Sequence, residues 1–224
     1  MTPYNFSPEA VILTTIQNLL SFVRTNYNDC QIANTPNESY LYKVFDGNKF
    51  ERYNYYEQAV GILITTKKDQ RHFTVDLSFN KQKNSPPSAF ISLGQEVPTY
   101  NGLGMDEGYN NSLAHGDTVD QTVYTRAFNT QFDLYIYSDQ YLEVIVLYQL
   151  IRCLLISFTT HLEVMGLRNL STPGKDIDKY PDFLPKDFFF RAISLRFFYE
   201  TEAPSFEPYN SYSNLIFHNI LKPE

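Results

Sequence analysis

The feature that most constrains the fold of this chain is one long apolar segment, residues 141–158. Ser138-Asp139 precedes this segment and Gly166 follows it. Serine and aspartate favour the position just before a helix, and glycine favours the position just after one. The sequence therefore predicts a single helix over 140–165, roughly 39 Å long at 1.5 Å per residue.

An apolar segment of this length also fits a membrane span. Against that interpretation, the segment carries Glu143, Gln149 and Arg152, and Arg152 lies near its middle. A charged side chain at the centre of a bilayer is costly, so ionisable residues are rare in spanning helices. We therefore predict that this helix is buried against a sheet and does not cross a membrane.

Residues on both sides of the central helix alternate between apolar and polar side chains. Before it, Phe132, Leu134 and Ile136 alternate with polar neighbours, and residues 189–197 repeat the pattern after it. A period of two is typical of strands that bury one face. Shorter apolar segments predict further strands over 41–50, 59–66, 73–79 and 89–93.

The start of the chain predicts a second helix. Ser7-Pro8-Glu9 supplies a capping hydroxyl, a proline for the first turn and an acid near the positive end of the helix dipole. Apolar residues then recur at helical spacing to about Tyr27. These elements predict an α+β protein with a mainly antiparallel sheet, flanked by an N-terminal helix and a long central helix. We expect a single domain over 1–202, with a long loop and a C-terminal arm.

Two segments fall outside the predicted helices and strands. Residues 94–121 are rich in glycine, asparagine and acids, and a compact domain rarely carries so long an irregular loop without a use for it. Residues 203–224 follow the last predicted strand, and exposed apolar side chains in such an arm usually mark a binding site. The candidate partner contacts in the loop and the arm are Tyr100, Met105, Tyr109, Leu113, Leu215, Ile216, Phe217, Ile220 and Leu221.

The composition argues against several function classes. The formal net charge is −7, and no segment supplies the basic face that binding to phosphates requires. Cys30 and Cys153 show neither metal-ligand spacing nor a disulfide framework, so we expect free thiols and a reducing compartment. The first residues lack the pattern of a signal peptide. The 18 Tyr and 18 Phe fit either A/T-rich codons or a surface that binds proteins.

Sequence motifs of catalysis are also missing. The four histidines are not spaced as zinc ligands, and there is neither a complete phosphate loop nor a Gly-x-Ser-x-Gly motif. Asp176, Asp178 and Asp182 lack the glycine and glutamate of an EF-hand. We therefore predict no catalytic, cofactor-binding or metal-binding residues. The alternatives are a cytosolic α+β hydrolase or transferase, whose site residues only folding brings together, and a monomeric adaptor.

The order of the predicted elements is informative. A helix is followed by meandering strands, a long loop, a long strand over 122–138, a long helix over 139–165 and a final strand over 188–199. This order resembles that of the tail-terminator and neck proteins of tailed bacteriophages. The A/T-rich composition is similar to that of gut phages, including the crAss-like group.

The resemblance implies a virion structural protein that is assembled in the host cytoplasm. Its copies would form a closed ring of about six or twelve subunits at the head–tail connector or tail terminus, in contact with neighbouring connector or tail proteins. DNA would pass through the lumen without specific binding, and neither a cofactor nor a membrane would take part. Acidic side chains of the loop would suit the lumen wall, although a solvated loop explains them equally well: Asp106, Glu107, Asp117 and Asp120.

The C-terminal arm provides a first test. If residues 203–224 clasp a neighbouring subunit, a chain without them should fold but no longer assemble. Circular dichroism would report folding, and sedimentation would report assembly. Normal assembly of the truncated chain would contradict the clasp, whereas loss of folding would mean that the arm packs within its own subunit.

Overall fold

The computed structural model describes residues 7–64, 72–77, 86–99, 108–111, 122–176 and 188–204. The chain divides into two compact units. The larger consists of Ser7–Glu96 and Thr130–Phe198, and the smaller includes Val97–Asn129 and the chain from Tyr199 onward. The elements in chain order are α1 (Pro8–Ile32), η1 (Pro36–Glu38), α2 (Tyr40–Phe45), β1 (Lys49–Phe50), β2 (Tyr53–Asn54), α3 (Tyr55–Leu63), β3 (Thr74–Asp76), β4 (Ser88–Pro98), β5 (Gly108–Asn111), β6 (Thr122–Ser138), α4 (Tyr141–Val164), β7 (Arg168–Ser171), β8 (Gly174–Asp176) and β9 (Phe189–Pro204).

Helix α1 begins where the sequence predicts and ends later than predicted. Ser7 is the N-cap, and its hydroxyl accepts a hydrogen bond from the Ala10 backbone N–H at 3.4 Å. The buried stripe of the helix continues past the predicted end, from Val23 to Cys30. Because seven residues make about two helical turns, both side chains lie on the same face. Burial of Cys30 therefore favours helix in a segment that is otherwise polar.

The prediction of a strand over 41–50 is wrong for most of that segment, which begins as α2. Ser39 caps this helix by accepting a hydrogen bond from the Tyr42 backbone N–H at 3.3 Å. Leu41 and Phe45, four residues apart, are both fully buried. A spacing of four places both side chains on one face of a helix, whereas a strand would need a spacing of two.

The prediction of a strand over 59–66 is also wrong, because residues up to Leu63 belong to α3. Asn54 is the N-cap, and its side-chain oxygen accepts a hydrogen bond from the Tyr56 backbone N–H at 3.0 Å. The buried residues Ala59, Ile62 and Leu63 are three and four apart. Short apolar runs do not distinguish a buried helix from a strand, so the cap was the informative signal here.

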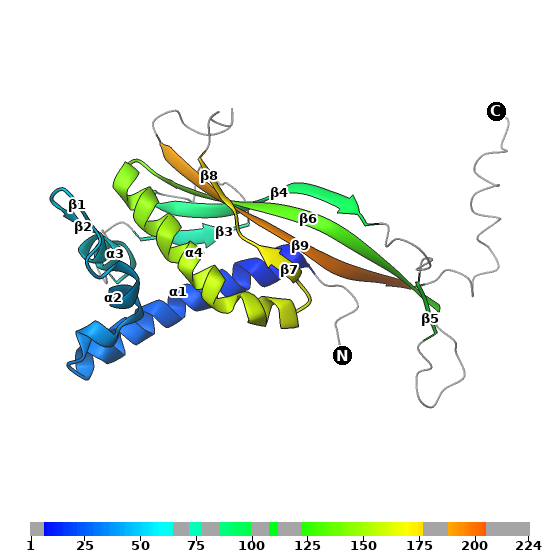
Figure 1. The fold of residues 1–224 in the computed structure, drawn as a ribbon, viewed down its shortest axis with the longest axis horizontal. Coiled ribbons are helices and arrows are strands. Elements are labelled where there is room, and N and C mark those ends of the chain that lie inside the picture. Colours follow the sequence, from blue (N-terminus) through cyan, green and yellow to red (C-terminus); the bar gives the residue numbers. More distant parts are fainter. Residues whose placement is uncertain are drawn as a thin grey trace, which may run out of the picture. The chain divides into compact units, whose positions relative to one another are not determined.

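The main sheet has the strand order β3-β4-β6-β9-β7, with β5 also paired to β6 and β8 to β9 (Figure 1). Strand β3 is parallel to β4, whereas β5, β7 and β8 are antiparallel to their partners. Tyr137 stacks on Phe190 and Gln131 bonds to Arg196, so β6 and β9 also run in opposite directions. The predicted fold class is confirmed: α+β, with a mainly antiparallel sheet, an N-terminal helix and a long central helix.

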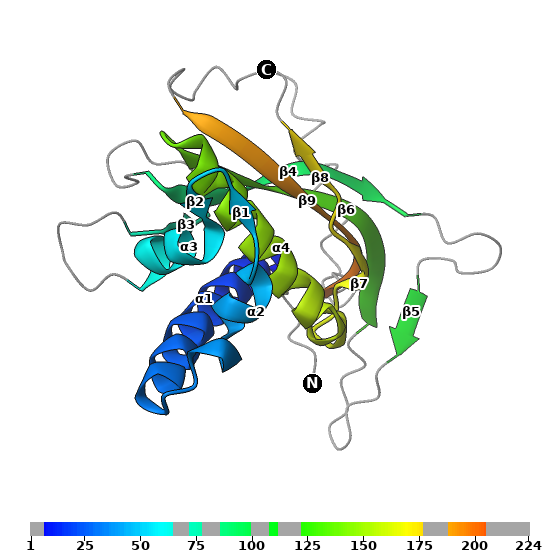
Figure 2. The same ribbon diagram turned by 60° about the vertical axis from the view of Figure 1, so that its left-hand side comes forward.

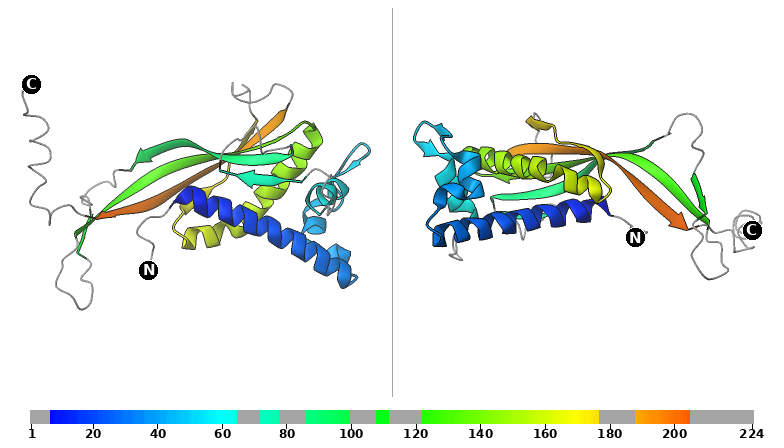
Figure 3. Two further views of the ribbon diagram at one scale, coloured as in Figure 1. Left: turned by 180° about the vertical axis from the view of Figure 1, so that it is seen from behind. Right: turned by 60° about the horizontal axis from the view of Figure 1, so that its bottom comes forward.

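Helix α4 and one face of the sheet form the core of the larger unit. Strands β6 and β9 present alternate residues to this core, and the rings of Phe132 and Phe197 stack there at 5.8 Å. Helix α1 lies on the same face of the sheet as α4 (Figure 1, Figure 3). The core residues of α4 recur every three or four positions: Val144, Leu147, Leu150, Ile151, Leu154 and Leu155.

By length and composition alone, α4 is also the one helix in the described residues that could cross a membrane. In this fold, nine of its residues are buried within the protein. Its first turn includes the buried Glu143, whose carboxylate accepts a hydrogen bond from the Ser138 hydroxyl at 2.5 Å. Packing on a sheet and a satisfied buried carboxylate are features of a core helix.

Side chains of α1 cover the outer edge of β3. Gln17 Nε2 donates a hydrogen bond to the Val75 carbonyl oxygen at 3.0 Å. Arg24 donates to the carbonyl oxygens of Phe73, at 3.3 Å, and Leu63, at 3.1 Å. An edge strand with free backbone groups is a template for a further strand. These bonds from α1 therefore oppose the addition of a partner strand at β3.

In the smaller unit, β5 pairs with β6 so that Tyr109 lies opposite Tyr124. The Thr99 backbone N–H donates to the Ala127 carbonyl oxygen at 2.9 Å. Part of the predicted irregular loop over 94–121 is therefore strand, at 94–98 in β4 and at 108–111 in β5.

Strand β9 extends to residue 204, beyond the predicted end at 199. A truncation that tests the arm should accordingly begin at residue 205.

Burial of α4 predicts opposite outcomes for two substitutions on the same helix. Leu150 is fully buried and Thr160 is exposed. Leu150→Asp should unfold the larger unit, because an unpaired charge in the core costs several kcal/mol. Thr160→Asp should change the free energy of unfolding by about 1 kcal/mol or less. Thermal melts followed by circular dichroism compare them, and equal melting temperatures would contradict the packing of α4.

Candidate functional site

The partner contacts and lumen residues predicted from the sequence lie outside the part of the chain whose side chains the structure describes. For Tyr109 the backbone is placed, in β5. These assignments therefore stay predictions. The others are Tyr100, Met105, Asp106, Glu107, Leu113, Asp117 and Asp120 of the loop, and Leu215, Ile216, Phe217, Ile220 and Leu221 of the arm.

The larger unit carries an exposed apolar patch that the sequence analysis missed. Phe50 and Tyr53 lie directly opposite each other in the β1–β2 hairpin, so their side chains share one face. They are 53% and 46% exposed. Large aromatic side chains on a protruding turn offer area for a partner at a low cost in conformational entropy. We call Phe50 and Tyr53 the hairpin patch.

The local sequence explains why this hairpin forms. Helix α2 ends at Phe45, and Gly47 takes the left-handed conformation (φ 74°) that glycine adopts without strain. The Tyr55 backbone N–H donates to the Asn48 carbonyl oxygen at 3.2 Å, which closes the base of the hairpin. Glu51 also has a positive φ, 53°, in the two-residue turn. A left-handed residue matches the twist of a tight hairpin.

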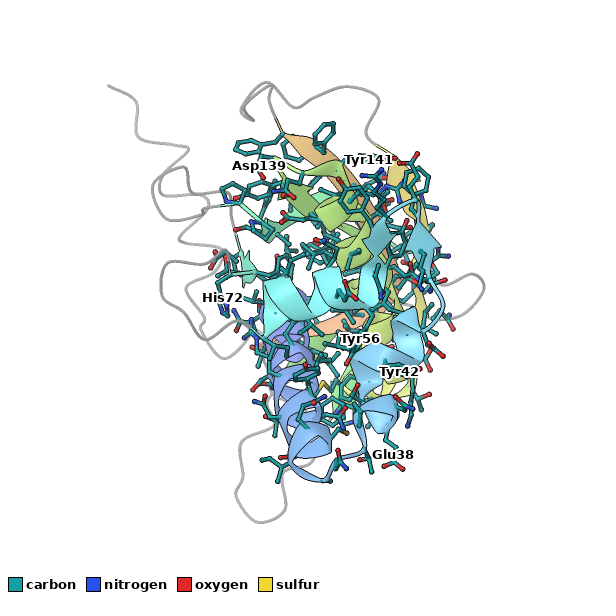
Figure 4. The ribbon with its side chains drawn as sticks, turned by 90° about the vertical axis from the view of Figure 1, so that its left-hand side faces the viewer. Glu38, Tyr42, Tyr56, His72, Asp139 and Tyr141 are labelled. Atoms are coloured by element: carbon teal, nitrogen blue, oxygen red, sulfur yellow. The ribbon has the colours of Figure 1, made fainter. Side chains whose placement is uncertain are left out.

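A base of packed tyrosines supports the hairpin. The Tyr40 backbone N–H donates to the side-chain oxygen of Asn26 at 2.8 Å, which ties α2 to α1. The rings of Tyr42 and Tyr56 meet edge to face at 5.5 Å, so α2 contacts α3 (Figure 4). The Tyr40 hydroxyl also lies 3.4 Å from the Ser157 hydroxyl of α4. The hairpin patch is therefore carried by helices that are anchored to the core.

The side-chain hydroxyls of Tyr40, Tyr42 and Tyr56 are neutral at physiological pH, because the pKa of each is raised. A hydrogen bond to Asp46 raises the pKa of Tyr42. Burial raises the pKa of Tyr40 and, together with the neighbouring Tyr27, the pKa of Tyr56. A tyrosine whose pKa lies above 10 remains protonated at physiological pH, so it donates and accepts hydrogen bonds but does not act as a base.

A second exposed apolar patch lies on the outer side of α4 and at its end. Ile156 is 57% exposed, Val164 is 80% exposed and Met165 is 42% exposed. Ile156 and Val164 are eight residues apart, so both lie on one side of the helix, roughly 12 Å apart along its axis. The exposed acid Glu163 lies beside them. We call Ile156, Val164 and Met165 the α4 stripe.

The two patches lie at different ends of the larger unit. The β1–β2 hairpin projects from α2 and α3 at one end, and the C-terminal end of α4 lies beside β7 at the other (Figure 1, Figure 3). Figure 2 turns the hairpin end toward the viewer, and the C-terminal end of α4 again lies beside β7. The larger unit therefore offers two separate apolar surfaces, one on the β1–β2 hairpin and one on α4.

The opposite face of the sheet carries a row of polar side chains. Asp133 is buried and accepts hydrogen bonds from the Ser194 hydroxyl at 2.5 Å and from Gln131 Nε2 at 3.0 Å. Arg196 Nε donates to Gln131 Oε1 at 2.9 Å. These bonds link β6 to β9 across the sheet and hold the carboxylate in place, as expected of a structural network.

Two described side chains with nucleophilic or acid–base potential, Cys153 and His72, have shifted pKa values. Burial raises the pKa of the Cys153 thiol, so the reactive thiolate is disfavoured at neutral pH. Burial and the nearby Arg24 guanidinium lower the pKa of His72. The neutral ring then accepts a hydrogen bond at Nε2 from Arg24, 3.1 Å away. His72 is thus one of the hydrogen-bond acceptors that hold the Arg24 guanidinium at the edge of β3.

Within the described ranges, no group of three His, Cys, Asp or Glu side chains is arranged to hold a metal ion. The hairpin patch and the α4 stripe are two of several exposed apolar features of this part of the chain. Both left a signal in the sequence. Two aromatics flank the polar pair Glu51-Arg52, and two apolar residues stand directly before the glycine that ends α4.

Comparison with known proteins adds no identification. No protein-family model matches the chain. No curated protein matches its sequence either.

The raised pKa of Cys153 predicts slow alkylation of its thiol. At pH 7.5 the native protein should react with iodoacetamide more slowly than a small free thiol, and the rate should still rise as the pH passes about 8.5, the ordinary thiol value. The Cys153→Ser variant is the control, since buried Cys30 should contribute little labelling. Fast labelling with an apparent pKa below 7.5 would instead reveal an activated nucleophile.

Proposed function

We propose that this chain is a structural subunit that assembles with copies of itself into a closed ring, as a virion protein at the head–tail connector or tail terminus of a tailed bacteriophage. The observation that carries the proposal is the pair of exposed apolar patches at different ends of the larger unit. Assembly, rather than catalysis, is what these described surfaces support best.

The placement of the patches favours a head-to-tail contact. In a two-fold dimer, one surface meets the same surface of the partner. Two unlike surfaces at separate places instead suit a contact in which each subunit offers one surface to each neighbour. Such contacts generate a ring when the rotation between subunits closes, and a filament when it does not.

The order of elements supports the location at the head–tail joint. Helix α1 comes first, and the long strand β6, the long helix α4 and the long strand β9 follow later in this order, with the short strands β7 and β8 between α4 and β9. The resemblance to tail-terminator and neck proteins rests on this part of the order, whereas two of the strands expected after the first helix are the helices α2 and α3. The net charge of −7 supports a lumen through which DNA passes without being held.

Native mass spectrometry of the purified chain over a range of concentrations tests the proposal. A closed ring should give one dominant species with a fixed number of copies, about six or twelve, that persists on dilution. A chain that is monomeric at every concentration would contradict the proposal and favour an adaptor or an enzyme. A series of species of increasing size would mean filaments, and a two-fold dimer would exclude head-to-tail assembly.

A further inference from the structure

We propose that Arg24 and His72 form a pH-sensitive clamp, which holds the edge strand β3 on helix α1 and loosens when His72 is protonated. The inference goes beyond the proposed ring and does not depend on it, because both residues lie within the larger unit of one chain. The device is conformational, since it sets how firmly the edge of the sheet is attached.

Arg24 is the centre of the clamp. Its Nε donates a hydrogen bond to the Leu63 carbonyl oxygen at 3.1 Å, and its Nη2 donates to the Phe73 carbonyl oxygen at 3.3 Å. Leu63 is the last residue of α3, and Phe73 directly precedes β3. One guanidinium on α1 therefore holds both the end of α3 and the start of β3.

His72 supplies the contact that responds to pH (Figure 4). Its Nε2 lies 3.1 Å from Arg24 Nη2. A guanidinium has only donors, so the ring must be neutral and accept at Nε2. A protonated ring would instead direct an N–H and a positive charge at a second cation. The contact is therefore compatible with neutral His72 alone.

The geometry couples this contact to the attachment of β3. The same nitrogen, Arg24 Nη2, donates to His72 and to the Phe73 carbonyl oxygen. A charged ring that repels this nitrogen also draws it away from the backbone. Because the bond to Phe73 is already long at 3.3 Å, a small displacement is enough to break it.

The charges around His72 oppose its protonation. Burial and the Arg24 guanidinium lower the pKa of His72, and the preceding residue in the sequence, Arg71, is a further cation. Within the described residues, no carboxylate of the surrounding elements counteracts this lowering. The acids of α1, α3, β3 and β4 are Glu9, Asp29, Glu57, Asp76 and Glu96.

The direction of the pH dependence follows from the lowered pKa. A free histidine ring titrates near 6.5. Because the clamped ring has a lower pKa, the detached ring binds more protons as the pH falls below 6.5, and detachment becomes more favourable. The clamp is therefore closed above about pH 7.5 and loosens as the pH falls through 6.5 toward the lowered pKa of His72.

Loosening the clamp affects the edge of the main sheet. Strand β3 pairs with β4 over three residues, Thr74–Asp76 with Ser88–Phe90. So short a strand depends on its further bonds to α1, which come from Gln17 and Arg24. When β3 separates, the outer edge of β4 becomes open to another strand.

Amide hydrogen exchange of the purified full chain tests the clamp. Exchange of Thr74–Asp76 is measured at pH 7.5 and 5.5 and corrected for the intrinsic rate at each pH. Protection in the wild-type chain should be about 5-fold lower at pH 5.5, the effect of losing one hydrogen bond. His72→Gln, which keeps an acceptor and never titrates, should give equal protection at both pH values. His72→Lys, which is charged at both, should give low protection at both.

His161 provides the matched control. It is the other histidine in the described part of the chain, and it lies exposed on α4 with its ring 4.4 Å from that of Phe158. His161→Gln should keep the wild-type response, and circular dichroism checks that each variant is folded. Equal protection of wild-type β3 at both pH values, or an unchanged response in His72→Gln, would overturn the proposal.

A second measurement needs no variant of His72. The ring proton signals of the wild-type chain, followed by NMR during a pH titration, give the pKa of His72 directly. We expect a midpoint below 6.5 that rises in Arg24→Gln, because the neighbouring cation is removed. A wild-type midpoint at or above 6.5 would show that Arg24 does not oppose protonation, and the clamp would be refuted.

Discussion

Burial of α4 against β6 and β9 is the interaction on which the rest of the structure depends. Leu147, Leu150 and Ile151 have no exposed surface, and the helix-facing residues of both strands are equally buried. The helix thereby holds its two flanking strands side by side on one surface. It also provides the support on which α1, α2 and α3 pack. Removing this core would therefore displace both exposed patches, since one lies on α4 itself and the other on helices that pack against it.

The part of the fold with strong periodicity could be predicted from the sequence. The alternation in β6 and β9, the central helix and the Ser7 cap of α1 each give one unambiguous local signal. The segments 41–50 and 59–66 could not be assigned in the same way, because a buried run of a few residues has no clear period. Their helices depend on the caps at Ser39 and Asn54 and on burial against α1 and α4, which only the assembled structure reveals.

The candidate site was harder to predict than the fold for a related reason. Sequence reasoning favours long polar loops and apolar tails, because these stand out from periodic segments. The exposure of Phe50 or Val164 depends on which face of an element is left uncovered after packing. Residues of the same types are fully buried in the same part of the chain: Phe45 lies five positions before Phe50, and Val146 lies on the same helix as Val164. Whether an aromatic or aliphatic residue belongs to the core or to a binding surface is therefore a property of the tertiary structure.

Helix α4 completes the core with its inner face, and its outer side and end carry the α4 stripe. Cryo-electron microscopy of the purified wild-type protein tests the proposed ring most directly. The account predicts closed rings with rotational symmetry. Single subunits, or two-fold dimers joined through like surfaces, would contradict it.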